Sequence, residues 1–583
     1  MALGCALLLA GCANRGIGPQ GGPKDTTPPV IVKTTPEPYA TNVPAIGTVI
    51  TLETNENINI KDATKIVVSP PQKNRPGIKG VGKHVTVSFS DTLKANSTYS
   101  IQFGKNIVDY TEGNPMDDYE FVFSTGGQID SLRVSGTVLD ARTLQPMEGM
   151  EIGLQSDLTD SAFYKQPFDY IAVTDAKGKF TITGVRDGDY RLYALKDVAN
   201  TYAYTHIGSE IAFYDSIIRP EVHLHATIDT LWSDSTHTAW DSLDVQTFTQ
   251  YLPNDVLLLS LTEDVSQQFF RKATRPLRGQ LNLLFNKDLT EAPKLELLDN
   301  PQRQDWIVRG FSERKDSCIY WIKDTTLLSQ DTLRLTLTYH ATAGLGLDTL
   351  RCDTLTVNYR QLAAKRKASA SDSEWTLLHN LNKSLEINDS VRIGFREPVM
   401  GVNDTLIHLQ VKQDTLWNPV PFVWQVDNAE CITQVIIDFD RDWEASYRLQ
   451  VDSLAFTSWY GHQSMPLTKP FQLKKPEEYA NLYVKVVADF DDGHVELMND
   501  KEVVLRTEPM GDEAAFEDLT PGTYLVRLYR DLNGNGKWDT GSVLEHRQGE
   551  PVYYYPKKLQ LRPNWDDEET WEPLTIEWEK QRP

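Results

Sequence analysis

Residues 93–126 read LKANSTYSIQFGKNIVDYTEGNPMDDYEFVFSTG, and this stretch decides the fold class. Within it, apolar and polar side chains alternate over 98–103, which is the pattern of a strand with one buried face. Asn96-Ser97 turns the chain into that run, and Gly113-Asn114-Pro115 turns it toward the next. The stretch therefore predicts short antiparallel strands joined by tight turns.

The same pattern extends through the rest of the chain. Alternating runs such as 65–68 and 84–89 are separated by turn clusters about ten residues apart, which is typical of β-sandwiches. At 583 residues with 40% apolar residues, the chain is long enough for about four or five separate cores. We therefore predict an all-β fold, a multidomain train of Ig-like and transthyretin-like β-sandwiches.

The charge balance excludes some partners. The chain has 58 basic and 81 acidic residues and a formal charge of −23. A surface this negative repels phosphate groups, so we expect no nucleic-acid partner and no polybasic attachment to anionic lipid.

The N-terminus has the pattern of an export signal. Residues 2–10 are small or apolar but too few to cross a bilayer, and they lead into Leu9-Ala10-Gly11-Cys12, which resembles a bacterial lipobox. We predict a signal peptide over 1–11 and acylation of the Cys12 thiol, which makes the lipid the membrane anchor. No basic residue precedes the apolar run, so we expect the true start to lie further upstream. Residues 12–27, rich in Gly and Pro, are then a flexible tether.

Two segments resemble known modules. TTPPVIVKTTPEPYATNVP at the entry and YEFVFSTG at the exit make residues 28–127 resemble the SbsA-type bacterial Ig-like domain. SGTVLDARTLQPMEGMEIGL, TDAKGKFTITGV and DGDYRLYALKD make 128–222 resemble a carboxypeptidase-regulatory-like domain, a transthyretin-type sandwich without protease chemistry.

An internal repeat extends this plan to the C-terminus. Gly188-Asp-Tyr190 followed by Asp197 has the same spacing as Gly522-Thr-Tyr524 followed by Asp531, which predicts a second transthyretin-like sandwich over 476–583. We expect a divergent Ig-like sandwich over 223–362 and another Ig-like sandwich over 363–475, the latter entered through a polar linker.

The most specific candidate site is DLNGNGKWD, residues 531–539. Oxygen-bearing side chains at positions one, three, five and nine with Gly at position six match the start of a calcium loop. Ser542 stands at position twelve instead of a bidentate Glu, and a metal-free turn rich in Asn and Gly has the same composition. The loop therefore either binds Ca²⁺, the one cofactor that the sequence suggests, through Asp531, Asn533, Asn535, the carbonyl of Lys537 and Asp539, or forms a turn without metal.

Other patterns leave alternatives open. Cys318 and Cys352 lie in strand-like runs of one predicted domain, so they form a disulfide or remain two buried thiols. Asp-(Ser/Thr)-aliphatic triplets such as Asp331-Thr332-Leu333 resemble an O-glycosylation sequon of Bacteroidota, but they also arise where a turn enters a strand. No motif of a catalytic nucleophile, metalloprotease or phosphate loop is present, so we expect no enzyme activity.

Taken together, the lipobox, the tether, the two module types and the final RDLNGNGKWDTG resemble a family of Ig-like outer-membrane lipoproteins of Bacteroidota. This resemblance implies a lipid-anchored envelope protein of the outer membrane, in either leaflet. It further implies a structural or interaction subunit that docks on an outer-membrane β-barrel complex, such as the one that assembles outer-membrane proteins. The alternative is a surface lipoprotein that binds a glycan or nutrient, for which an exposed row of aromatic side chains is the expected sign.

Overall fold

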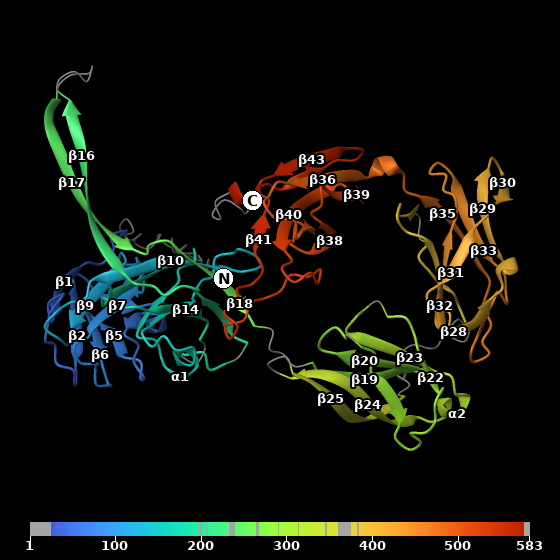
Figure 1. Ribbon diagram of the computed structural model, residues 1–583, viewed down its shortest axis with the longest axis horizontal. Coiled ribbons are helices and arrows are strands. Elements are labelled where there is room, and N and C mark those ends of the chain that lie inside the picture. Colours follow the sequence, from blue (N-terminus) through green and yellow to red (C-terminus); the bar gives the residue numbers. More distant parts are fainter. Residues whose placement is uncertain are drawn as a thin grey trace, which may run out of the picture. The chain divides into compact units, whose positions relative to one another are not determined.

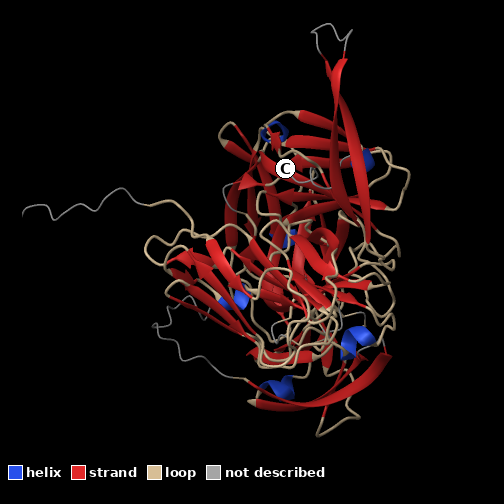
Figure 2. Ribbon diagram, turned by 90° about the vertical axis from the view of Figure 1, so that its left-hand side faces the viewer, coloured by secondary structure: helices blue, strands red, loops and turns tan. Residues whose placement is uncertain are grey.

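The computed structural model describes residues 25–197, 201–206, 208–232, 240–263, 268–289, 291–312, 314–343, 347–359, 375–381 and 384–575. Nearly all regular structure in these residues is strand (Figure 2), and the two α-helices, α1 (Ala162–Lys165) and α2 (Thr325–Leu328), have four residues each. The predicted all-β train of sandwiches is confirmed. The chain divides into two compact units, 1–263 with 540–549 and 264–539 with 550–583.

The first domain is a small sandwich with its own core. Its outer sheet has the order β1-β2-β6-β5, its second sheet the order β4-β7-β9, and β3 pairs with β8. The alternation that predicted these strands places Tyr99, Ile101 and Phe103 of one strand in the core. The strands are β1 (Ile31–Thr35), β2 (Val49–Thr54), β3 (Ile58–Ile60), β4 (Val67–Ser69), β5 (Gly77–Val81), β6 (His84–Ser88), β7 (Thr98–Gly104), β8 (Ile107–Asp109) and β9 (Tyr119–Ser124).

The second domain extends beyond the predicted boundary at residue 222. Its last strand, β18, pairs in parallel with β10 over residues 256–260 and antiparallel with β15 over its last two residues, so it joins the two sheets of this domain. The strand order is β12-β11-β14-β15-β18-β10-β13. The strands are β10 (Leu132–Asp140), β11 (Glu151–Gln155), β12 (Tyr170–Val173), β13 (Lys179–Val185), β14 (Arg191–Leu195), β15 (Glu210–Phe213) and β18 (Val256–Thr262).

A long two-stranded ribbon interrupts the second domain. β16 (Glu221–Trp232) and β17 (Trp240–Leu252) pair only with each other and extend away from the sheet that β18 completes (Figure 1). The sequence assigned this stretch to a third sandwich because its alternation looks like that of a sheet strand. Periodicity cannot distinguish a strand in a ribbon from one in a sandwich, since both alternate with period two.

Residues 540–549 belong to the first unit although they lie between two strands of the last domain. The side chain of Thr540 donates to the carbonyl oxygen of Thr262 at 2.9 Å. The amide of Val543 donates to the buried carboxylate of Glu263 at 2.7 Å. These contacts cap the end of β18, which no local sequence pattern indicates.

The third domain is a sandwich of a four-stranded sheet, β19-β20-β23-β22, and a three-stranded sheet, β21-β24-β25. Its core contains Trp306, Phe285 and Cys318. The strands are β19 (Phe270–Leu277), β20 (Gln280–Phe285), β21 (Lys294–Leu297), β22 (Ile307–Arg309), β23 (Ser317–Ile322), β24 (Thr332–Ala343) and β25 (Leu347–Asn358).

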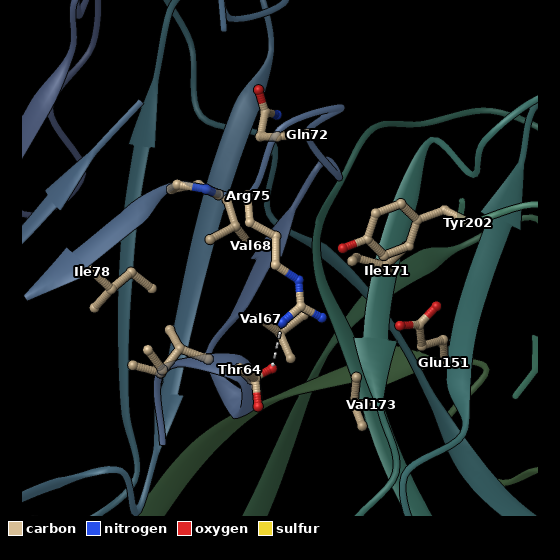
Figure 3. A pocket seen from close by; sticks show the side chains of 13 residues that line it. Thr64, Val67, Val68, Gln72, Arg75, Ile78, Glu151, Ile171, Val173 and Tyr202 are labelled. Atoms are coloured by element: carbon tan, nitrogen blue, oxygen red, sulfur yellow. Dashed lines mark hydrogen bonds between the residues drawn. The ribbon is translucent and has the colours of Figure 1, made fainter. Parts of the chain in front are cut away.

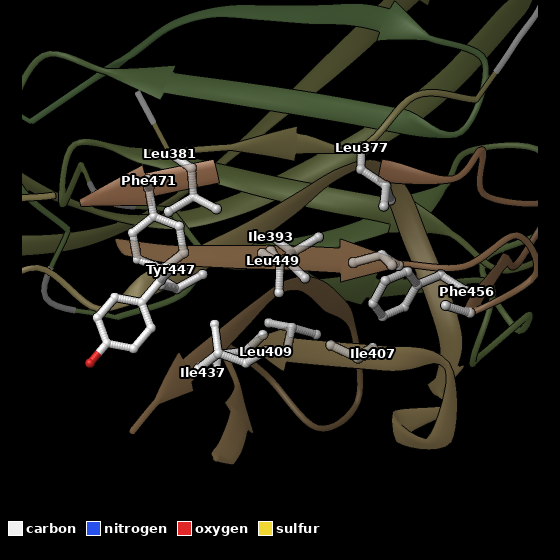
Figure 4. Close-up of a cluster of buried hydrophobic side chains, with 14 of the residues drawn as sticks. Leu377, Leu381, Ile393, Ile407, Leu409, Ile437, Tyr447, Leu449, Phe456 and Phe471 are labelled. Carbon is white, nitrogen blue, oxygen red and sulfur yellow. The ribbon is translucent and has the colours of Figure 1, made fainter. Parts of the chain in front are cut away.

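The fourth domain packs two sheets around the core drawn in Figure 4, where Leu409, Leu449 and Ile393 meet. One sheet has the order β26-β28-β32-β31 with β34 on β28, and the other β27-β35-β33-β29-β30. The strands are β26 (Leu378–His379), β27 (Ser384–Leu385), β28 (Val391–Val402), β29 (Ile407–Gln413), β30 (Leu416–Pro419), β31 (Val423–Val426), β32 (Ile432–Asp438), β33 (Ser446–Val451), β34 (Phe456–Ser458) and β35 (Leu467–Leu473).

The last domain has sheets β39-β36-β43 and β38-β37-β40-β41, with β42 on β40. One ion pair is buried in it: Arg527 Nε donates to Glu496 Oε2 at 2.5 Å, and the two residues are 4% and 6% exposed. The strands are β36 (Ala480–Val486), β37 (Gly493–Asn499), β38 (Val504–Pro509), β39 (Ala514–Leu519), β40 (Gly522–Arg530), β41 (Val552–Tyr554), β42 (Leu559–Leu561) and β43 (Asp566–Trp571).

Candidate functional site

The predicted anchor residue, Cys12, and the first part of the tether lie outside the described residues. Across the described part of the chain, no helix combines the length and apolarity that a membrane crossing needs. The acylation of Cys12 therefore stays a prediction.

The predicted calcium loop forms a closed turn directly after β40. Asp531, which is 6% exposed, accepts hydrogen bonds from the amides of Gly534, Asn535 and Gly536 at 2.8, 3.1 and 2.7 Å. Burial by itself would raise the pKa of Asp531, but these amides outweigh it and hold the pKa below its ordinary value. Gly536 has a φ of +73°, a left-handed conformation that favours glycine.

The other predicted ligands surround Asp539. The side-chain amides of Asn533 and Asn535 each donate to Asp539 Oδ2 at 2.5 Å, so a cation requires both amides to turn their oxygens inward. The ammonium of Lys537 lies 3.3 Å from Asp288. Within the described ranges, no three His, Cys, Asp or Glu side chains stand in a geometry that holds a metal ion. The donor types fit calcium, and the loop as it stands is closed by its own hydrogen bonds.

Glu550 also belongs to this loop, although no pattern in the sequence identified it. Its carboxylate accepts the amides of Leu532 at 2.8 Å and Asp539 at 2.9 Å, while Ser542 instead pairs with Arg547 in the small hairpin that precedes Glu550. Burial raises the pKa of Glu550, and the negative charges of Asp539 and Asp531 add to this effect. Residues 540–549 separate Glu550 from the loop by ten residues, so a motif with fixed spacing does not include it.

Matching hydrogen bonds in the second and last domains confirm the internal repeat. Tyr190 donates its hydroxyl to the carbonyl oxygen of Arg186 at 3.0 Å, and Tyr524 donates to that of Thr520 at 2.5 Å, four residues upstream in both domains. Both tyrosines are 5% exposed. The equal spacing in the sequence therefore reflects the same local structure.

The repeat continues into the loop after each strand. Asp197 Oδ2 accepts the amide of Tyr202 at 2.7 Å, as Asp531 Oδ2 accepts that of Gly536, five residues further along in each case. Tyr202 has a φ of +55°, so a bulky residue occupies the left-handed position that glycine holds in the last domain. Such a residue stores about 1–2 kcal/mol of backbone strain.

The predicted disulfide is not formed, because Cys318 and Cys352 are both free thiols. Cys318 lies on β23 and faces the core, whereas Cys352 lies on β25 in the opposite sheet with an exposed side chain. The alternative of two buried thiols is also wrong for Cys352. Alternation places neighbouring residues of a strand on opposite faces, and the sequence did not show which face each cysteine takes.

The described tryptophans Trp417, Trp424 and Trp443 of the fourth domain do not form an exposed row. Trp443 packs against the core of the fourth domain, and Arg448 covers the ring of Trp417 at 4.4 Å. Trp424 is 38% exposed and lies on β31, in the other sheet from Trp417. The arrangement of these side chains is that of packing residues rather than of a sugar platform.

A groove between the first two domains brings charged and apolar side chains together. It has a volume of about 780 Å³, in the range of ligand-binding clefts. The two domains that form it are held together by direct contacts, among them the amide of Ile171 donating to Ser69 Oγ at 3.0 Å in a buried position. The groove is lined by β4, β7 and β9 on one side and by β11, β12 and β13 on the other.

One end of the groove leads into a narrow pit (Figure 3). The pit measures about 60 Å³, and its walls include Val68, Ile78 and Ile171. Glu151 lies at the junction between pit and groove, facing Arg75 and the ring of Tyr202. Its Oε2 atom is buried and has no hydrogen-bond partner among the described residues.

The pKa of Glu151 at this junction is strongly shifted. Burial raises the pKa of Glu151 to about 8, the negative charge of Asp197 raises it further, and the Arg75 guanidinium opposes the change. Glu151 is therefore largely protonated at neutral pH. No sequence signal identifies it, since it is one polar residue in the strand-like run MEIGL.

Comparison with known families matches only part of the chain. Residues 25–125 match the family described as bacterial Ig-like domain, which covers the first sandwich. Comparison with curated protein sequences gives no significant match.

Solved structures resemble the chain only in the broadest sense. The Bacillus anthracis TIE protein shares 7% identity over 95% of this chain and 76% of its own, with a TM-score of 0.13. Domains 1–6 of the surface layer protein SbsC share 11% identity over 85% and 63%, with a TM-score of 0.13. The Bacteroides ovatus SGBP-B protein, in complex with a mixed-linkage heptasaccharide, shares 10% over 75% and 94%, with a TM-score of 0.17. These scores carry no argument about function.

The chain is thus a multidomain all-β protein whose first domain matches the bacterial Ig-like family.

Proposed function

We propose that this protein is a lipid-anchored, non-enzymatic subunit of the cell envelope that binds other proteins and docks on an outer-membrane β-barrel complex. The observation that carries the proposal is the groove between the first two domains, a cleft of about 780 Å³ lined by charged and polar side chains, with one buried carboxyl oxygen of Glu151 at its end. Such a cleft suits recognition, because its charged and polar side chains can exchange hydrogen bonds to water for hydrogen bonds to a ligand.

The support for a lipid anchor and for an outer-membrane partner comes mainly from the sequence. The lipobox ending at Cys12 and the tether over 12–27 support attachment to a membrane, and the resemblance to outer-membrane lipoproteins of Bacteroidota supports the location. The ribbon β16–β17 supports docking, since a two-stranded arm offers backbone hydrogen-bonding groups along its edges. The scattered tryptophans weigh against a glycan as the ligand.

The test is recovery of the partner from native membranes. The full chain, tagged at its C-terminus, is cross-linked in cells, extracted in mild detergent, purified and analysed by mass spectrometry. We expect an enriched β-barrel protein from wild type. The Cys12→Ser variant should lose both the lipid mass and the partner while it remains folded. Recovery of no barrel protein from wild type, or equal recovery with Cys12→Ser, contradicts the proposal.

We also propose that residues 531–539 bind Ca²⁺ once the side-chain amides of Asn533 and Asn535 turn their oxygens inward. The carboxylates of Asp531 and Asp539, the two side-chain amides and the carbonyl of Lys537 are oxygen donors of the kind that calcium prefers. A bound cation would offset the negative charges of Asp539 and Asp531, which add to the effect of burial in raising the pKa of Glu550.

A further inference from the structure

The strand β25 ends one sheet of the third domain and has an open edge. It pairs with β24 on one side over its full length. On its other side, the one ladder contact among the described residues is a bridge between Arg275 and Tyr359, just beyond its end. With twelve residues, β25 is the longest edge strand of the described sandwiches. The backbone groups along such an edge can bond a further strand.

Three other edge strands carry residues that discourage pairing, whereas β25 does not. β19 contains Pro276, β38 ends with Pro509, and β43 begins with four acidic residues, 566–569. Proline lacks the N–H that a ladder needs, and a run of like charges repels a neighbouring copy. The sequence of β25, LDTLRCDTLTVN, has no proline and no lysine. Its edge is therefore unprotected.

The hydrogen bonds of β24 determine which residues of β25 direct their backbone groups outward. The amide of Tyr359 donates to the carbonyl oxygen of Asp331 at 2.8 Å, and the register of β24 with β25 continues from there without a bulge. Hydrogen-bonded and non-hydrogen-bonded pairs alternate in an antiparallel ladder, so the odd-numbered residues of β25 bond β24. The backbone N–H and C=O groups that face the open edge are therefore those of residues 350, 352, 354 and 356.

Two opposite charges make this edge complementary to itself. Arg351 Nε lies 3.4 Å from Asp353 Oδ1, and their side chains are 54% and 29% exposed. The Tyr339 hydroxyl donates to the other carboxylate oxygen of Asp353 at 3.0 Å. If a second β25 lies antiparallel to the first with Cys352 opposite its own copy, Arg351 of each chain stands opposite Asp353 of the other. Opposite charges in directly opposed positions stabilise a strand pair.

The charges also select this register over the neighbouring ones. A pairing centred on residue 351 or on residue 353 still brings the even-numbered residues together, so the backbone alone does not distinguish the three registers. The first of these alternatives opposes two copies of Arg351, and the second opposes two copies of Asp353. Like charges in opposed positions destabilise a strand pair, so the pairing centred on Cys352 is favoured.

We propose that β25 pairs antiparallel with β25 of a second copy of this chain, centred on Cys352, so that the two three-stranded sheets become one continuous sheet. The partner is a second copy because the register and the charges of the edge are complementary to themselves, as a two-fold interface requires. The pairing is independent of the proposed docking on a β-barrel and involves neither the lipid anchor nor the groove.

Cys352 provides a direct test, because its thiol is free and exposed. In the paired edges the two Cys352 Cα atoms lie about 5.5 Å apart, which is within the span of a disulfide. Cells that produce the full chain are treated with diamide, which takes two electrons and two protons from two thiols as the S–S bond forms. We expect a covalent dimer on a non-reducing gel. A reductant should split this dimer, and Cys352→Ser should prevent it.

Charge reversal tests the register. Arg351→Asp makes the opposed residues of two copies all acidic, and Asp353→Arg makes them all basic, so each variant alone should form about tenfold less dimer. When the two variants are produced together with different tags, they should cross-link to each other at the wild-type level, since every Asp then faces an Arg. The ion pair within each chain stays broken in this mixture. A role confined to the single chain therefore predicts no recovery.

A proline variant tests the edge itself without a change of charge. Thr354→Pro removes an N–H that faces outward and leaves the hydrogen bonds to β24 in place, so it should abolish the dimer while the purified chain melts close to wild type. The proposal is overturned if no dimer depends on Cys352, if either charge reversal or Thr354→Pro leaves the dimer unchanged, or if the mixed variants do not cross-link.

Discussion

Replacing Glu151 by Gln should stabilise the first two domains, and the gain should grow with pH. The ordinary pKa of a glutamate is 4.5, and burial beside Asp197 raises that of Glu151 to about 8. A carboxyl whose pKa is raised by folding stabilises the folded state fully below pH 4.5. This contribution is lost as the pH rises to about 8, because folding then requires proton uptake or a buried charge. Glutamine has the shape of the protonated acid and never ionises.

The magnitude follows from the two pKa values. At about 1.4 kcal/mol per pH unit, the cost to wild type reaches about 3 kcal/mol at pH 7 and about 5 kcal/mol above pH 8. These are upper limits, because water in the groove screens the charge. At about 2–4 °C per kcal/mol for units of this size, Glu151→Gln should raise the melting temperature by up to about 6–12 °C at pH 7.

Differential scanning calorimetry of the full chain at pH 5, 7 and 8.5 measures the effect. The transition that contains the first two domains should move in the variant, while the others stay in place. At pH 5 the two proteins should melt within about 2 °C of each other. Glu37→Gln is the matched control and should show no pH-dependent difference. A difference between Glu151→Gln and wild type that is the same at pH 5 and 8.5 would refute the reasoning, since only ionisation makes the gain depend on pH.

Three further predictions concern the other domains. Calcium should raise the melting temperature of the last domain by several degrees, and EDTA should reverse this rise. The Asp531→Asn variant should not respond to calcium. A calorimetric titration of wild type with calcium that produces no heat contradicts the site. Glu496→Leu should cost about 3–5 kcal/mol in urea unfolding, because it leaves the buried charge of Arg527 without its carboxylate partner. Adding Arg527→Met should restore most of this loss, and additive losses in the double variant would contradict a coupled pair. In native protein Cys352 should react with a thiol reagent within minutes while Cys318 reacts only after unfolding; an absence of any fast thiol would instead favour a disulfide.

Local patterns were sufficient for much of the fold. Alternation in runs such as 98–103 predicted the strands, and the spacing of Tyr190 and Tyr524 predicted a repeat that the structure shows as matching hydrogen bonds. The same patterns could not separate the ribbon β16–β17 from a sandwich or place Cys352 on its outer face. Periodicity describes one strand at a time, whereas pairing partners and buried faces depend on strands far away in the chain.

By itself the sequence determined the all-β class, the succession of sandwiches, the match of the first domain to the Ig-like family, and the turn over 531–539. These features depend on residues close together in the chain, whose turn propensities and alternation act locally. Only the tertiary structure decided that Glu550 closes that turn across an insertion and that β18 completes the second domain. It alone brought Glu151, Arg75 and Tyr202 to one junction between two domains. The charge and burial of such a site arise from packing of distant segments, and packing leaves no signature in the spacing of residues along the chain.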